Sequence, residues 1–372
     1  MAKGKLKKLF PGGNTSQGFF SYYDYLIDPD ATRIFVIKGG PGVGKSSLMR
    51  SVGEVMLNMG YDVEYHCCSS DNGSLDGVCI PQIRVALIDG TAPHIVDPKN
   101  PGAVDEIVHL GDFWHEDILR DNKEAILKSN RRVGRLFRSA YSNLKEAKVI
   151  QDEWASYITE AMDFAQVNEV TIALFEELFS DAATNFRIAV KPRHLFATAI
   201  TPEGPVNYLH TVLQDTNKLF MIKGEPGSGK ATLIGKLAGH ANTLGLYTEI
   251  YHCALRPQNI DILVIPELAA AVANLSPPVS FDPYGLSNLK SCKEVNLSVF
   301  IDPQATAQYQ NALSGCSQRF DAAFDRAVDF LSQAKAEHDL MESFYIPAMD
   351  FSAINAKKEE ILARIIRYAE EF

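Results

Sequence analysis

The sequence lacks any long hydrophobic run. Nowhere do 18 consecutive apolar residues occur, so no membrane span is expected. It also lacks a disulfide framework, because its six cysteines show no regular spacing in 372 residues, which is typical of free thiols in a reducing cytoplasm. No apolar stretch follows the basic segment 1–10, so that segment is not typical of a secretory signal. These absences favour a cytoplasmic protein.

The sequence also has fewer basic than acidic residues. The chain has 36 Lys and Arg against 46 Asp and Glu, a net charge of −10. Such a chain has no general attraction to polyanions, so we expect neither nucleic acid nor a membrane as a partner. The length of 372 residues exceeds what one hydrophobic core usually serves, which favours two domains.

The chain contains an internal sequence repeat of two copies. Residues 33–50 and 218–235 are identical at nine of eighteen positions, at an offset of 185. We therefore expect an N-terminal domain over 1–186 and a C-terminal domain over 187–372. Further matching pairs are Tyr65-His66-Cys67 with Tyr251-His252-Cys253 and Ala161-Met162-Asp163-Phe164 with Ala348-Met349-Asp350-Phe351.

Each copy predicts strands interleaved with helices. Apolar runs predict strands, and apolar residues at helical spacing predict the helix between the first two strands. The fold class that follows is α/β, with two tandem domains of a parallel sheet flanked by helices, each carrying an appended helical hairpin. In the first copy the strands are 33–38, 62–67 and 84–89 and the helix is 46–59; the hairpins are 116–179 and 304–372.

A glycine-rich segment fits the phosphate-loop pattern G-x-x-x-x-G-K-[ST] and lies between a predicted strand and helix. Its backbone N–H groups would wrap phosphate oxygens, Lys45 would reach the β- and γ-phosphates, and Ser46 would ligate Mg²⁺. ATP is expected rather than GTP, because the guanine-selecting N-K-x-D pattern is absent. The candidate nucleotide ligands are Gly39, Gly40, Pro41, Gly42, Val43, Gly44, Lys45, Ser46 and Ser47.

Asp89 ends an apolar strand, where a second Mg²⁺ ligand would be placed, although Asp89-Gly90 is also a turn signal. The catalytic candidates are Lys45, Asp89 and Arg132. Arg132 would serve as an arginine finger or on a lid, but a solvated helical face is the stronger interpretation of its arginine-rich segment. No hydrolytic base is assigned. Candidates for it are Asp71, His94 and Asp97.

The second loop retains the backbone pattern but loses both metal ligands. Ala231 stands where the first copy has Ser46, and Asn274 stands where it has Asp89. We expect this loop to bind nucleotide weakly or without turnover; the alternative is that Thr232 shifts inward and restores the metal. Its candidate nucleotide ligands are Gly224, Gly227, Gly229, Lys230 and Thr232.

The chain resembles, over nearly its full length, a bacterial family of duplicated P-loop proteins labelled ATPase or nucleotide-kinase-like. The resemblance implies ATP binding at residues 39–46. Relatives in that family tend to carry Ser or Thr after the second lysine, and Ala231 departs from that pattern. The segments that carry the resemblance are Phe10-Pro11-Gly12-Gly13, Asp89-Gly90-Thr91-Ala92-Pro93-His94, Leu110-Gly111-Asp112-Phe113-Trp114 and Arg193-His194-Leu195-Phe196.

Three functions remain open at this stage. The first is a Mg²⁺-dependent ATPase switch with its active site in the N-terminal half. The second is a kinase that transfers the γ-phosphate to a small acceptor, and the third is a nucleotide-binding scaffold without turnover. The helical hairpins offer a surface for a protein partner. The sequence sets no oligomeric state.

Overall fold

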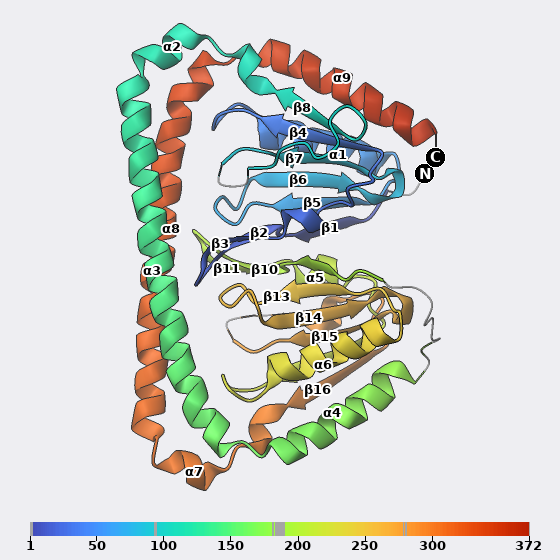
Figure 1. Ribbon diagram of the computed structural model, residues 1–372, viewed down its shortest axis with the longest axis vertical. Coiled ribbons are helices and arrows are strands. Elements are labelled where there is room, and N and C mark those ends of the chain that lie inside the picture. Colours follow the sequence, from blue (N-terminus) through green and yellow to red (C-terminus); the bar gives the residue numbers. More distant parts are fainter. Residues whose placement is uncertain are drawn as a thin grey trace.

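The computed structural model describes residues 3–92, 95–180, 182, 190–277, 279 and 281–371. It shows an α/β protein with two six-stranded sheets (Figure 1). The first sheet has, in spatial order, β1 (Leu6–Leu9), β5 (Val63–Cys67), β6 (Leu75–Ile80), β7 (Val85–Asp89), β4 (Arg33–Lys38) and β8 (Asp105–His109). The second has β9 (Arg193–Leu195), β13 (Glu249–His252), β14 (Ile260–Ile265), β15 (Ala270–Asn274), β12 (Lys218–Lys223) and β16 (Ser291–Asn296).

Both sheets are mixed, so the expectation of a parallel sheet was wrong in one respect. Strands β6 and β14 run antiparallel to both of their neighbours, whereas the other pairings are parallel. The cause is the length of the connection: only residues 81–84 join β6 to β7, and a parallel crossover needs about a dozen residues.

The strand registers correct one sequence match between the copies. Glu64 pairs with Cys79 in the first sheet, and Glu249 pairs with Val264 in the second, so the structural offset is 185 throughout these strands. The sequence match of Tyr65-His66-Cys67 to Tyr251-His252-Cys253 has an offset of 186 instead. In the structure His66 therefore corresponds to Tyr251.

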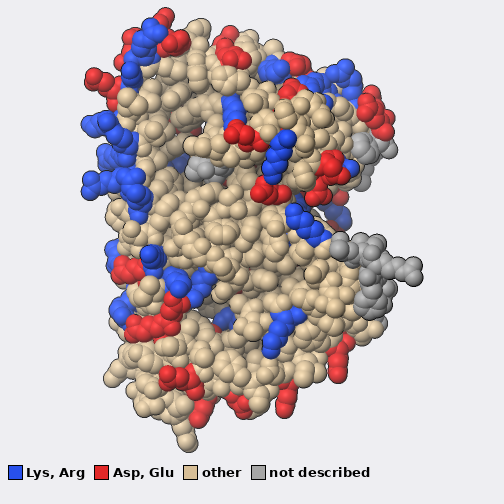
Figure 2. Space-filling model, in the orientation of Figure 1, with Lys and Arg blue, Asp and Glu red and all other residues tan. Residues whose placement is uncertain are grey.

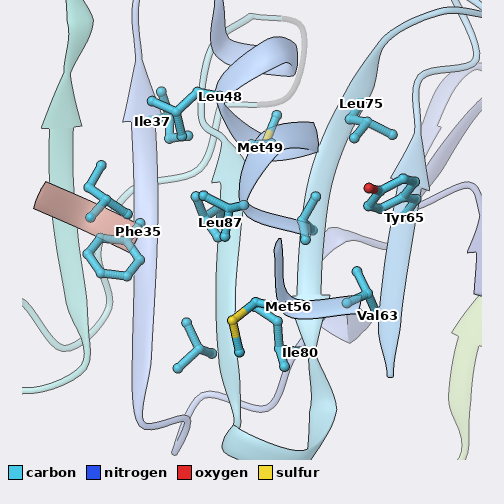
Figure 3. Close-up of a cluster of buried hydrophobic side chains, with 14 of the residues drawn as sticks. Phe35, Ile37, Leu48, Met49, Met56, Val63, Tyr65, Leu75, Ile80 and Leu87 are labelled. Atoms are coloured by element: carbon cyan, nitrogen blue, oxygen red, sulfur yellow. The ribbon is translucent and has the colours of Figure 1, made fainter. Parts of the chain in front are cut away.

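One helix of each half packs directly on its own sheet. These helices are α1 (Lys45–Asn58) and α6 (Lys230–Thr243). In the first core, Met49 and Met56 of α1 lie against Phe35, Ile37 and Leu87 of the sheet (Figure 3). The remaining helices are α2 (Glu116–Asp121), α3 (Lys123–Ala161), α4 (Phe164–Phe179), α5 (Leu209–Val212), α7 (Pro303–Ala307), α8 (Gln310–Tyr345) and α9 (Phe351–Glu370).

The two halves meet as an internal pseudo-dimer. Phe10 and Phe196, which correspond in the two copies, exchange backbone hydrogen bonds of 2.9 and 3.0 Å. Two further isolated bridges join Trp114 to Met349 and Met162 to Ile301. Each is the counterpart of the other, because Trp114 matches Ile301 and Met162 matches Met349 in the two copies. The hairpins β2 (Gly12–Thr15) with β3 (Gly18–Ser21) and β10 (Thr198–Thr201) with β11 (Gly204–Asn207) lie in this central region (Figure 1).

The long helices cross between the halves. Helices α3 and α8 pack against each other along one side of the molecule, so neither half forms the expected hairpin of its own (Figure 1). Helix α4 of the first half then joins the core of the second sheet, and α9 of the second half joins the core of the first. An apolar helical face predicts burial but not which sheet buries it, which is why the sequence did not reveal this exchange. The expected boundary between residues 186 and 187 lies outside the described residues.

No described helix is long and apolar enough to cross a membrane. The side of the molecule formed by α3 and α8 instead carries a concentration of Lys and Arg side chains (Figure 2).

Candidate functional site

The first glycine-rich loop joins β4 to α1, as the sequence predicted. Gly42 and Gly44 have φ angles of 69° and 86°, a left-handed conformation that favours glycine. Gly44 is also the N-cap of α1, and it supplies no side chain to the free N–H groups of the helix. The first turn of α1 therefore presents unsatisfied donors and a partial positive charge toward the loop.

The side chains expected around the phosphates come together. The Lys45 ammonium donates hydrogen bonds to the carbonyls of Gly39 and Gly40, at 3.0 and 2.9 Å, and lies 3.6 Å from the carboxylate of Asp89. Asp89 in turn accepts hydrogen bonds from Thr91. The Ser46 hydroxyl accepts the backbone N–H of Leu75 at 3.0 Å. Asp89 thus forms the turn that its sequence predicted and also faces the lysine; its role as a metal ligand stays a prediction.

The second half of the chain supplies the cover of this loop. A side chain at Gly40 would meet the ring of Tyr345 at 2.7 Å, and one at Gly42 would meet Ile346 at 3.1 Å. The Gly42 N–H donates a hydrogen bond of 3.1 Å to the carboxylate of Glu342, near the end of α8. A negatively charged oxygen therefore already lies on a backbone donor of the loop.

A cavity of about 1020 Å³ opens over the loop. Lys45, Ser46 and Asp89 line it. Helices α3 and α8 contribute both apolar and polar side chains to its lining. The apolar ones include Ile126, Val133, Phe137 and Met341, and the polar ones include Asn130, Lys335, His338 and Glu342.

The cavity is also lined by polar residues that sequence reasoning missed, among them Asp76 and Arg50. Asp76 lies on β6, directly after the Leu75 whose N–H binds Ser46, and is buried. Its counterpart in the second copy is Asp261, so comparison of the copies at offset 185 could have found it. Arg50 is the second, one turn along α1 from Ser46; it donates a hydrogen bond of 2.7 Å to the carbonyl of Gly73.

The structure does not bring Arg132 to the loop; the residue lies on an exposed helical face, the stronger of the two interpretations of its segment. It is exposed, does not line the cavity, and lies 3.2 Å from the carboxylate of Glu337. The helix turns it outward because Val133, its neighbour, faces the cavity. Arg50 is the arginine that the structure places there instead. Of the three base candidates, Asp71 lines the cavity, Asp97 is ion-paired with Lys38, and His94 lies outside the described residues.

The second loop has the same backbone but different surroundings. Gly224, Gly227 and Gly229 again have positive φ angles, and Lys230 again donates to the carbonyls of Gly224 and Glu225. The end of α3 covers this loop closely: a side chain at Gly227 would lie 2.4 Å from the carbonyl oxygen of Ala155. Ala155 holds the place that Glu342 holds at the first loop, so no carboxylate reaches these donors from it.

The polar groups beneath the second loop satisfy one another. Asn274 donates a hydrogen bond of 2.9 Å to Asp261. Burial raises the pKa of Asp261 and lowers the pKa of Lys230, which disfavours charge on both. Thr232 is exposed and makes no side-chain hydrogen bond within the described part of the chain. The arrangement does not bring Thr232 into the place of the missing hydroxyl.

The donor set of the first loop fits Mg²⁺, which prefers hard oxygen ligands. Ser46, Asp89 and Asp76 all line the same cavity and offer a hydroxyl and two carboxylates. A second group has ligand atoms within 4.8 Å of one another: His338, Asp339 and Glu342. There Asp339 is ion-paired with Lys335 and Glu342 is bound to Gly42, so we assign no metal to it.

Comparison of the chain with protein-family models, with curated proteins and with solved structures found no match. The function must therefore be argued from the site itself.

Proposed function

We propose that the chain binds Mg·ATP at the first loop and acts as a slow ATPase switch, with the second loop as a site without turnover. The observation that carries the proposal is the hydrogen bond from Gly42 to the carboxylate of Glu342. A carboxylate oxygen accepts a hydrogen bond from this loop, as a phosphate oxygen would. The open N-terminus of α1 and the Lys45 ammonium add positive potential at the same place, as phosphate binding requires.

Each residue then has a defined task. Lys45 would exchange its two loop carbonyls for phosphate oxygens, and the loop's N–H groups would hold the remaining oxygens. Ser46, Asp89 and Asp76 would hold Mg²⁺, which neutralises charge on the phosphates when bound. Arg50 lies one turn along α1 from Ser46, on the same face of that helix, and would stabilise negative charge that develops on the γ-phosphate. Apolar side chains of α3 and α8, such as Val133 and Met341, would contact the less polar part of the nucleotide.

The size of the cavity supports a kinase as the second candidate. At about 1020 Å³ it lies at the upper limit of ordinary ligand sites, which run from roughly 300 to 1,000 Å³. A second small molecule could therefore lie beside the nucleotide. The apolar side chains of α3 and α8 would favour an acceptor with an aromatic or aliphatic part.

The test is to measure Mg·ATP binding and ADP release by the whole chain, with and without nucleoside monophosphates. Slow release without an acceptor supports the switch, acceptor-dependent release supports the kinase, and binding without release leaves a scaffold. Lys45→Ala should abolish both binding and release. The matched control is Lys230→Ala in the second loop, which should leave release intact. Turnover that survives Lys45→Ala would place the site elsewhere.

A further inference from the structure

One stretch of α3 departs sharply from the acidic character of the chain. From residue 125 to residue 145 it has no Asp or Glu and six basic residues. All six are exposed, and Figure 2 shows Lys and Arg gathered along the side where α3 runs in Figure 1. We call these six residues the basic stripe: Lys128, Arg131, Arg132, Arg135, Arg138 and Lys145.

The stripe is almost free of neutralising partners. Arg132 is ion-paired with Glu337, and none of the other five forms an ion pair with a described residue. Several members lie three or four residues apart, such as Lys128 and Arg131 or Arg135 and Arg138. Like charges at this spacing on a helix repel and destabilise it. The stripe is therefore a cost to the folded chain unless something outside the chain compensates for it.

The duplicated helix shows that the fold does not need this charge. Ala140, Leu144 and Ala147 of α3 are buried in the same way as Ala327, Leu331 and Ala334 of α8, at an offset of 187. Yet only one member of the stripe has a basic counterpart. The residues of α8 at the six positions are Gly315, Gln318, Arg319, Ala322, Asp325 and Ser332. The same helix packing is thus achieved without the cations.

The stripe also borders a hollow suited to phosphate. The hollow has a volume of about 310 Å³, and it is lined by Arg135, Arg138, Ser139, Ser142, Asn143 and Phe330. Guanidinium groups bind phosphate through two parallel hydrogen bonds, and the Ser139 hydroxyl offers a further donor. Phe330 provides an aromatic surface beside these cations.

We propose that the basic stripe binds the phosphate backbone of a nucleic acid. From Lys128 to Lys145 the helix rises about 26 Å, which matches roughly seven or eight phosphates along one duplex strand. The opposite face of α3 is covered by α8 and the nucleotide cavity, so it has no apolar face to insert into a membrane. This assignment is independent of the proposed function of the first loop. It revises the expectation, drawn from net charge alone, that nucleic acid is not a partner.

The test measures binding of a labelled DNA duplex, of about twenty base pairs and mixed sequence, to the whole chain across a salt series. With up to six phosphate contacts, the logarithm of affinity should fall with the logarithm of salt at a slope of up to about −5. Arg135→Gln with Arg138→Gln should weaken binding at least about tenfold at low salt and make the slope shallower by about 2.

The matched control removes the same charge elsewhere. Arg84→Gln with Arg319→Gln takes two exposed arginines that are ion-paired with Asp30 and Glu153. This control should bind the duplex as the unaltered chain does, and both variants should unfold cooperatively and at no lower temperature than is needed for the binding assay. The proposal is overturned if the unaltered chain does not bind at low salt, if both double variants lose affinity equally, or if phosphatidylserine vesicles bind and the duplex does not.

Discussion

The carboxylate of Glu342 and a bound phosphate require the same backbone donor. Gly42 donates its N–H to this carboxylate across 3.1 Å, and Glu342 has no counterpart at the second loop, where Ala155 stands. A nucleotide must therefore displace Glu342 from Gly42. Glu342→Gln keeps the shape of the side chain and removes its charge, so we expect it to bind Mg·ATP more tightly.

The size of the effect follows from the type of hydrogen bond. A hydrogen bond to a charged group contributes about 1.5–3 kcal/mol, and a neutral one roughly half as much. The side chain of Glu342 is 31% exposed, so solvent weakens the charged bond. We therefore expect a gain of about 1 kcal/mol, or roughly fivefold in Kd. Repulsion between the carboxylate and the polyphosphate acts in the same direction.

Calorimetric titration with Mg·ATP measures this difference directly. The control is Glu337→Gln on the same helix, which removes the same charge from a residue that pairs with Arg132 and does not line the cavity. Glu337→Gln should leave the Kd unchanged. An unchanged or weaker affinity in Glu342→Gln would refute the argument, because it would mean that the carboxylate does not compete with phosphate.

Three further outcomes follow from the structure. Gly227→Ala forces a left-handed residue with a methyl 2.4 Å from the Ala155 carbonyl, and should lower the free energy of unfolding by about 3 kcal/mol in a urea titration; a neutral result would contradict the close covering of this loop. Burial, with the nearby His194, lowers the pKa of His252 to about 4, below the ordinary 6.5. Below pH 6.5 the unfolded chain binds a proton at His252 that the folded chain does not, so the free energy of unfolding should fall by about 3 kcal/mol from pH 6.5 to 4. His252→Asn should flatten this part of the plot of unfolding free energy against pH. An unaltered plot would exclude this histidine as the cause. Fragments 1–182 and 190–372 should each be insoluble alone and soluble when co-expressed, which a size-exclusion profile would show; a soluble monomeric fragment would contradict the helix exchange.

Local patterns predicted the parts of the fold that local physics determines. The apolar run before Gly39 and the helical spacing after Lys45 specify a strand and a helix, and the structure has them as β4 and α1. The antiparallel strand β6 was not expected. Its sequence, Leu75-Asp76-Gly77-Val78-Cys79-Ile80, contains a carboxylate and a glycine that weaken the strand pattern. Only the short connection to β7 fixes its direction.

The parts of the site that sequence reasoning missed are separated from the loop along the chain. Glu342 lies 300 residues from Gly42, and no local pattern relates the two. Asp76, in contrast, could have been found from the sequence, because Asp261 stands at the matching position of the second copy, at the same offset of 185 as the two loops. The position of Arg132 has a physical cause too. Neighbouring positions on a helix point in different directions, so Arg132 faces solvent while Val133 lines the cavity.

The exchange of helices changes what the degenerate copy means. Three differences between the two loops remove an oxygen ligand or a charge, and all three fall on the second loop: Ala231 for Ser46, Asn274 for Asp89, and Ala155 for Glu342. The first two changes lie in the second half of the chain, but Ala155 lies in the first. The lost ligands and charges therefore all belong to one composite site, which is formed by the second loop and the helix of the first half that covers it. They are not confined to one half of the chain. The second half supplies Glu342 and the cover of the first loop, so it is not merely an inactive duplicate of the first half. Any turnover at Lys45 takes place in a cavity that the second half completes.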